Sequence, residues 1–136
     1  MSKQNFFKKG NLKISYRYYK RSKKTLIFLH GLLSDMSGKK SNFLNNYCRK
    51  NNISYLCFDF QGHGRSSGEF TNFGISDWYD DLDNIVKYLK IRNFILIGSS
   101  MGGWVAIIYA LMHPKKVTKL IGLSLIHISE PTRPLD

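Results

Sequence analysis

The 136-residue sequence has only two cysteines and three prolines, and it has no long apolar run. Cys48 and Cys57 have neither the spacing of a metal site nor enough partners for a disulfide framework. No stretch approaches the roughly 20 apolar residues of a membrane-spanning helix, and no N-terminal apolar region resembles a signal peptide. We therefore expect a cytoplasmic protein with no metal site, no transmembrane segment and a reducing environment.

Acidic residues are also scarce, because nine Asp and Glu stand against 21 Lys and Arg, for a formal net charge of +12. Every charged residue before Asp35 is basic. This balance is compatible with nucleic-acid binding, but the lysines lie within strand-like alternation and form no known nucleic-acid-binding element. The abundance of Lys, Asn, Ile, Tyr and Phe is instead typical of an AT-rich coding sequence. We expect no nucleic-acid partner and a weak preference for acidic partners.

Apolar periodicity predicts alternating strands and helices. Residues 5–19 form a predicted hairpin that turns at Gly10. Residues 25–29 and 53–60 are continuous apolar runs, typical of strands that are buried on both faces of a parallel sheet. Between them, residues 39–50 carry apolar side chains at helical spacing. The predicted apolar face of this helix consists of Phe43, Leu44, Tyr47 and Cys48.

A second helix is predicted after the glycine-rich loop 62–73, with Ser76 as its N-cap. Three aspartates lie near its positive end, where the helix dipole explains them better than a metal site; they are Asp77, Asp80 and Asp81. Residues 93–98 and 117–123 are predicted strands, and the helix 101–112 between them is apolar nearly all round, as expected of a buried helix. This order predicts an α/β fold, with an antiparallel hairpin and then parallel strands with helices on both faces.

A serine lies at the junction between the predicted strand 93–98 and the helix that follows it. A strand that leads directly into a helix strains its junction residue, and Gly98 and Gly102 remove the collisions that neighbouring Cβ atoms would cause. The hydroxyl of Ser100 then lies at a helix N-terminus, where free N–H groups and the helix dipole favour the oxyanion of acyl transfer. The pattern predicts a nucleophilic serine.

Two further motifs precede this turn, and each follows a predicted strand. His30-Gly31 comes after the first apolar run, and residues 59–66, with the sequence Asp-Phe-Gln-Gly-His-Gly-Arg-Ser, come after the second. Together with the serine turn, these motifs resemble those of the α/β-hydrolase superfamily, and they occur in the same order along the chain. The resemblance covers residues 24–123. Within it, the chain is most similar to the subgroup that includes a palmitoyl-protein thioesterase, also described as an acyl-glucuronide esterase.

The resemblance implies a three-layer α/β-hydrolase sheet and a serine hydrolase without a cofactor. Ser100 would be the nucleophile of an acyl-enzyme, and the backbone N–H groups of Leu32 and Met101 would form the oxyanion hole. The expected substrates are acyl thioesters or carboxylic esters, on a small molecule or an acylated protein. The alternatives are another α/β-hydrolase such as a lipase or peptidase, and a hydrolase-fold module that only binds.

The acid and the histidine of a catalytic triad are absent from this pattern. In α/β-hydrolases they follow the nucleophile along the chain, acid first. After Ser100 there is no Asp or Glu before His127. The three other histidines precede the nucleophile or end its helix, and we expect no catalytic role for them; they are His30, His63 and His113. With an incomplete triad, we expect this chain to be inactive.

The end of the sequence does not continue the family pattern. Residues 123–133 resemble the translation of a sequencing-library adapter, in which case His127 is foreign to the protein. We expect residues 1–123 to be the N-terminal part of one α/β-hydrolase domain and residues 124–136 to be a non-native tail. The alternative is a genuine short variant with a divergent C-terminus. An uncovered apolar helix and sheet edge should make such a truncated chain poorly soluble.

Overall fold

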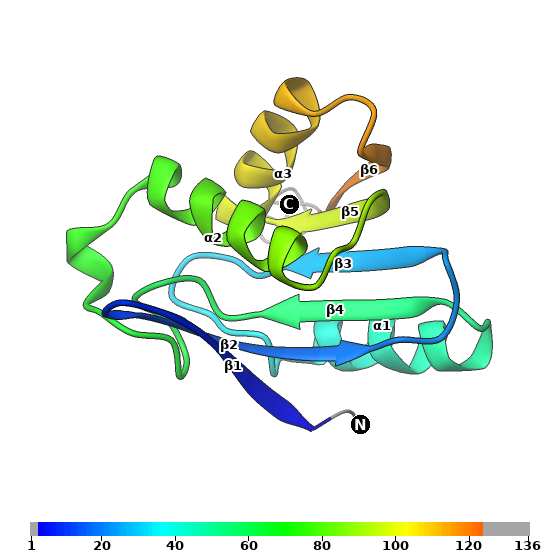
Figure 1. The fold of residues 1–136 in the computed structure, drawn as a ribbon, viewed down its shortest axis with the longest axis horizontal. Helices are drawn as coiled ribbons and strands as arrows, with labels where there is room; N and C mark the ends of the chain where they lie inside the picture. Colours follow the sequence, from blue (N-terminus) through cyan, green and yellow to red (C-terminus); the bar gives the residue numbers. More distant parts are fainter. Residues whose placement is uncertain (1–2, 124–136) are drawn as a thin grey trace, which may run out of the picture.

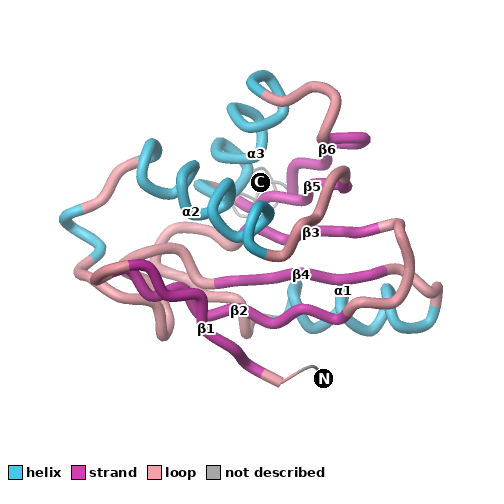
Figure 2. The backbone as a smooth tube through the Cα atoms, viewed as in Figure 1, coloured by secondary structure: helices cyan, strands magenta, loops and turns pink. Residues whose placement is uncertain are grey.

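The computed structural model describes residues 3–123, which fold around a six-stranded sheet (Figure 1). The strands are β1 Gln4–Lys9, β2 Leu12–Tyr19, β3 Thr25–Leu29, β4 Ser54–Phe58, β5 Phe94–Ser99 and β6 Val117–Leu123. Their order in the sheet is β1-β2-β4-β3-β5-β6. The β1–β2 hairpin joins β4 antiparallel, whereas β4, β3, β5 and β6 run parallel. Figure 2 shows the strands of this sheet in magenta, with the helices in cyan. The predicted α/β class is confirmed, with an antiparallel hairpin followed by parallel strands.

Helices cover both faces of this sheet, so the described residues form three layers (Figure 1). The α-helices are α1 Lys39–Lys50, α2 Ile75–Tyr88 and α3 Met101–Met112, and a short 3-10 helix, η1, spans Phe70–Asn72. One core cluster packs α2 and α3 against the sheet, through residues such as Leu82 and Val105. A second cluster on the opposite face includes Cys48 of α1 and Tyr55 of β4. The strands between the layers alternate their side chains into the two clusters.

The buried face of α1 differs from the predicted one. Phe43 is 69% exposed and Tyr47 is 48% exposed, whereas Ser41 and Asn45 are buried beside Cys48. The hydroxyl of Ser41 lies 2.7 Å from that of Tyr55, so the polar face of the helix finds a partner inside the sheet layer. Apolar spacing alone therefore predicted the helix and its ends but misassigned part of its inner face.

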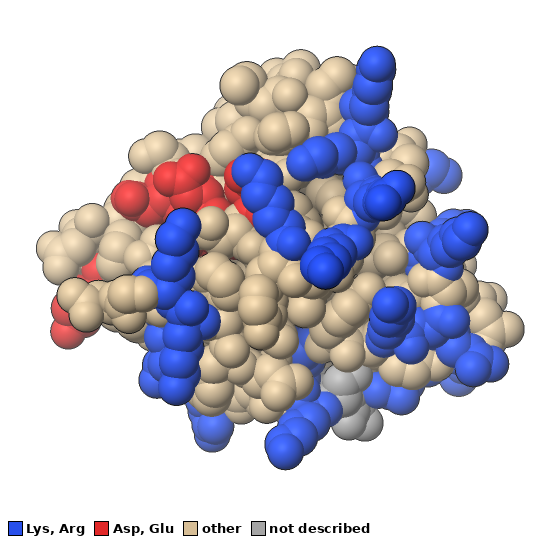
Figure 3. Space-filling model, in the orientation of Figure 1, with Lys and Arg blue, Asp and Glu red and all other residues tan. Residues whose placement is uncertain are grey.

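The start of α2 also differs, because Gly74 and not Ser76 is the N-cap. The Gly74 N–H donates to Asp77 Oδ2 at 2.9 Å, which gives Asp77 the capping role that its position predicted. Asp81, the last of the three aspartates, differs from Asp77 because its side chain is fully buried. Figure 3 shows acidic side chains gathered over α2, whereas Lys and Arg are spread over several other parts of this face.

The helix α3 is apolar nearly all round, as predicted, but it is not buried all round. Trp104 is 59% exposed and Leu111 is 76% exposed on its outer side. The strand β6 beside it is the last strand of the sheet in the described residues, and most of its positions are exposed. No helix within residues 3–123 is long and apolar enough to cross a membrane.

Candidate functional site

The three motifs singled out from the sequence meet at one edge of the sheet. In the parallel register, Leu29 of β3 pairs with Phe58 of β4 on one side and with Gly98 of β5 on the other. The loops that follow these strands therefore leave the sheet next to one another, at the carboxyl ends where open α/β sheets bind their ligands. The site is built at this edge.

Ser100 occupies the turn between β5 and α3. Its backbone has φ 57° and ψ −119°, a sparsely populated conformation for a residue with a side chain. The Ser100 carbonyl accepts the N–H groups of Gly103 and Trp104, at 2.9 and 3.2 Å, so α3 begins immediately after the strained residue. This sharp turn holds the hydroxyl at the N-terminus of a helix.

Gly98 and Gly102 are required here by close backbone contact. A Cβ atom on Gly98 would lie 2.6 Å from Gly103 Cα, and one on Gly102 would lie 2.6 Å from the His30 carbonyl oxygen. Neither glycine has a positive φ. The glycines therefore let the helix pack against β5 and the β3 loop, while the backbone strain falls on Ser100 itself.

A cavity of about 370 Å³ opens beside Ser100. Leu32 lines it together with Ser100, and Met101 is the first residue of α3, so the structure brings the predicted nucleophile and both predicted N–H donors to one place. Gly31 lies against the serine, since a Cβ there would be 3.2 Å from Ser100 Cβ. The Nζ of Lys40 reaches the same cavity and donates to Ser99 Oγ at 3.2 Å.

Asp59 organises the loops around the cavity, a role that the sequence did not reveal. Its buried carboxylate accepts the Met36 N–H at Oδ1 (2.8 Å) and the Arg65 N–H at Oδ2 (3.0 Å). Ser66 Oγ donates to the Asp59 carbonyl at 2.6 Å. Burial raises the pKa of Asp59, and the two N–H donors oppose that shift. One side chain thus joins the loop after β3 to the loop after β4.

His30 has a structural role, as its position predicted. Its Nε2 accepts the Phe60 N–H at 3.0 Å, and its Nδ1 donates to the Gly31 carbonyl at 2.7 Å. Burial lowers the pKa of His30 to about 4, so the ring is neutral near pH 7. With both nitrogens engaged in this way, His30 is not available as a base for Ser100.

Asp81 of α2 accepts hydrogen bonds from the loop after β4. Its Oδ2 accepts the Gln61 N–H and its Oδ1 accepts Gln61 Nε2, both at 2.8 Å. Trp78 Nε1 donates to the Gln61 carbonyl at 2.9 Å, and His63 Nδ1 lies 3.1 Å from the same oxygen. Burial raises the pKa of Asp81 to about 7. This carboxylate therefore anchors the loop through Gln61, a role that differs from the predicted interaction with the helix dipole, because Asp81 lies beyond the first turn of α2.

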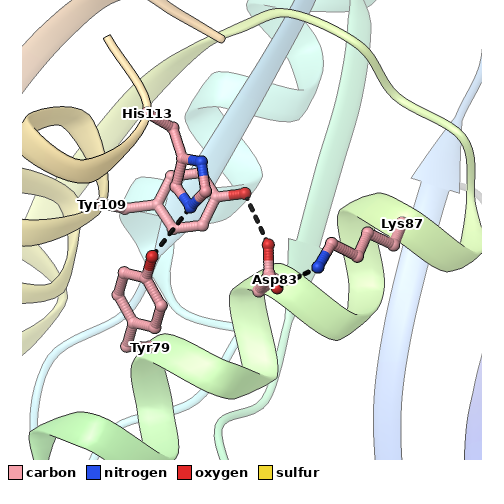
Figure 4. A network of polar contacts seen from close by, with 5 residues as sticks. All are labelled: Tyr79, Asp83, Lys87, Tyr109 and His113. Carbon is pink, nitrogen blue, oxygen red and sulfur yellow. Dashed lines mark hydrogen bonds and ion pairs between the residues drawn. The ribbon is translucent and has the colours of Figure 1, made fainter.

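His113 takes part in a separate polar cluster between α2 and α3 (Figure 4). Its Nε2 lies 2.8 Å from the hydroxyl of Tyr79. The Tyr109 hydroxyl donates to Asp83 Oδ1 at 2.9 Å, and Lys87 Nζ forms an ion pair with Asp83 Oδ2 at 2.7 Å. These contacts join the two helices, so His113 acts in packing and lies away from the serine turn.

No histidine within residues 3–123 is hydrogen-bonded to Ser100, and no group of three or more His, Cys, Asp or Glu in that range could hold a metal ion. His127 and the adapter-like tail lie outside the described residues. The described site therefore contains a serine at a strained turn beside a cavity, and no histidine within residues 3–123 is hydrogen-bonded to that serine.

Comparison with known proteins identifies the fold family. The sequence profile described as "alpha/beta hydrolase fold" matches residues 24–136. The chain belongs to the alpha/beta hydrolase family. The mitochondrial palmitoyl-protein thioesterase ABHD10 of Rattus norvegicus is 32% identical over 121 residues, which are 88% of this chain and 41% of the relative. The sn-1-specific diacylglycerol lipase ABHD11 of Xenopus laevis is 36% identical over 105 residues, or 74% of this chain and 31% of the relative.

Solved alpha/beta hydrolase structures superpose on the same part of the fold. The structure of alpha/beta hydrolase domain-containing protein 10 from mouse matches with a TM-score of 0.84 and 30% identity, and the match covers 89% of this chain and 49% of that one. The chain thus spans about two fifths of the length of the rat relative and about half of the mouse structure. The rat relative is named as mitochondrial; the cytoplasmic location expected here stays a prediction.

Proposed function

We propose that this chain supplies the nucleophile of a longer serine hydrolase, which cleaves carboxylic esters or acyl thioesters through an acyl-enzyme on Ser100. The observation that carries the proposal is the backbone of Ser100, at φ 57° between a strand and a helix and open to the 370 Å³ cavity. A strained serine at a helix N-terminus has little structural benefit. Strain of this kind is typical of functional residues.

In the proposed mechanism, Ser100 Oγ forms a bond to the acyl carbon, and the bond to the leaving oxygen or sulfur then breaks. The negative charge on the carbonyl oxygen would be held by the N–H groups of Leu32 and Met101. The Leu32 N–H has no hydrogen-bond acceptor within residues 3–123, and the first N–H groups of a helix have no partner inside it. Both donors are thus free to bind an oxyanion. Water would then release the acid and restore the serine.

The proposal requires a base from outside the described residues. His30 and His113 are engaged elsewhere, and a serine hydroxyl without a base is a weak nucleophile near pH 7. We therefore expect the 136-residue chain alone to be inactive. The DNA downstream of the codon for Leu123, free of adapter sequence, should encode an Asp at a strand end and then a His in a loop. A reading frame with neither would contradict the catalytic assignment.

The substrate class is proposed from the relatives. The rat relative is named a palmitoyl-protein thioesterase and the frog relative a diacylglycerol lipase, so acyl thioesters and carboxylic esters are both proposed. A hydrolase-fold module that only binds is the second candidate. The retained turn at Ser100 favours the enzyme.

A fluorophosphonate probe separates these two candidates. The whole protein, encoded by the adapter-free gene, should be labelled, and Ser100→Ala should abolish the label. Ser99→Ala is the matched control, because its hydroxyl lies one residue away, and it should keep the label. A folded whole protein that stays unlabelled would overturn the proposal and favour the binding module.

A further inference from the structure

Lys40 reaches the cavity from α1, the helix that begins where the loop after β3 ends. It lies in the first turn of α1, and its Nζ donates to Ser99 Oγ at 3.2 Å, across 59 positions of sequence. Lys40, Leu32 and Ser100 line the same cavity. A positive charge therefore lies one residue away from the proposed nucleophile.

This charge has no carboxylate partner within residues 3–123. The ion pair found there joins Lys87 to Asp83, outside the cavity. Asp35 also lines the cavity, but its Oδ1 accepts the N–H and the hydroxyl of Ser37, at 2.8 and 2.6 Å. These hydrogen bonds lower the pKa of Asp35, which keeps it ionised and directed toward its own turn. The partner of Lys40 in the cavity is a neutral hydroxyl.

The surroundings of Lys40 add to its positive potential. The helix α1 has no acidic residue in its first turn and no side-chain cap, and its first residues line the cavity. Its positive dipole end therefore acts in the same direction as the ammonium group. A bound group with a negative charge would interact favourably with both, whereas a neutral group would leave the exposed ammonium to the Ser99 hydroxyl and solvent.

Resting on the function proposed above, we propose that Lys40 selects substrates with an anionic oxygen group, a carboxylate or a phosphate, close to the ester or thioester that reacts. Adjacent Cα atoms are 3.8 Å apart, so the anion would lie roughly 4–8 Å from the carbonyl that Ser100 attacks. Lys40 takes no part in bond making. It binds the substrate and determines specificity.

Two substrate pairs test this in the whole protein. The 4-nitrophenyl monoester of glutarate is compared with its neutral methyl ester, and 2-(acetylthio)ethyl phosphate with its neutral dimethyl ester. The first pair places the anion on the acyl side, and the second places it on the leaving-group side. We expect Lys40→Met to raise KM about tenfold for the anionic member of one pair, the size of one lost charge-assisted hydrogen bond. The neutral members should keep their KM, and kcat should change little. Lys40→Arg should retain the preference.

Lys39→Met is the matched control, because Lys39 also lines the cavity and the change in net charge is the same, but Lys39 forms no hydrogen bond with Ser99. An equal loss for charged and neutral substrates would overturn the assignment. The same loss in Lys39→Met would do so too, since it would show a general field effect. Calorimetry with the glutarate monoester and Ser100→Ala protein gives a readout without turnover, in which Lys40→Met should weaken binding about tenfold. Hydrolysis of the neutral ester that survives Ser100→Ala would instead overturn the proposed function.

Discussion

A methyl group on Gly102 would lie 2.6 Å from the carbonyl oxygen of His30. Gly102→Ala should therefore displace the loop after β3 and lower the free energy of unfolding by roughly 1–3 kcal/mol, the usual cost of overpacking. In Gly103→Ala, the new Cβ would come no closer than 3.4 Å to the Gly98 carbonyl oxygen, and alanine is the better helix former. Urea unfolding of the whole protein compares the two variants. Equal midpoints would contradict the steric role of Gly102.

Strain at Ser100 predicts that removing its Cβ stabilises the fold. Relief of the strained backbone is worth about 1–3 kcal/mol, and the added freedom of glycine in the unfolded chain costs about 0.4–1 kcal/mol. Ser100→Gly should therefore unfold at a higher temperature than Ser100→Ala, which keeps the Cβ and the strain. Thermal unfolding followed by circular dichroism measures this difference. If the alanine variant were the more stable one, the strain at φ 57° would not be real.

Asp81 predicts a loss of stability as the pH rises. Burial raises its pKa to about 7 in the folded state, above the ordinary value of 3.8, so between these values the folded state holds a proton that the unfolded state has lost. Its contribution to the free energy of unfolding is therefore largest below about pH 4 and falls until about pH 7. His30 acts in the opposite sense over pH 4 to 6.5, because its pKa is lowered to about 4.

Asp81→Asn isolates this contribution. The asparagine can still accept the Gln61 N–H through its Oδ1. The Gln61 side-chain amide can rotate so that its Oε1 accepts a hydrogen bond from the asparagine Nδ2. The stability of the wild type relative to this variant should fall between pH 4 and pH 7 and then become constant. Chemical unfolding at several pH values measures it, and a constant difference would show that Asp81 keeps an ordinary pKa.

The exposed apolar face of α3 predicts self-association of the 136-residue chain. Leu111 and Met112 are 76% and 66% exposed on α3, which packs beside β6, the last strand of the sheet within residues 3–123. Leu111→Lys should shift the chain toward monomer in size-exclusion chromatography with light scattering. Phe43→Lys is the control, because Phe43 is 69% exposed on α1, on the opposite face of the sheet from α3, and it should have little effect. A wild-type chain that is monomeric at high concentration would contradict this prediction.

The strands and the two ends of α1 followed from the sequence because they depend on local apolar spacing. β3 and β4 are continuous apolar runs that lie between two layers, and α1 spans the predicted residues 39–50. The inner face of α1 was wrong in part, because Ser41 is buried through a hydrogen bond to Tyr55 on another element. Partners that lie on distant segments do not appear in helical spacing.

The candidate site was predictable to the extent that its residues lie in motifs. Ser100, Gly98 and Gly102 share one five-residue turn, and their local geometry follows from it. Lys40 was missed because its contact with Ser99 depends on the pairing of β3 with β5 and on the packing of α1. The two joining carboxylates, Asp59 and Asp81, were missed as loop anchors for the same reason.

The carboxylate of Asp59 links the loop after β3 to the loop after β4, and without this link the two loop lengths could vary independently among homologues. Because one oxygen holds Met36 and the other holds Arg65, an insertion in either loop would shift the acceptor of the other. Changes in loop length on the two sides of the cavity should therefore occur together among homologues. An engineer who grafts a new loop after β3 would need to redesign residues 59–66 in the same step.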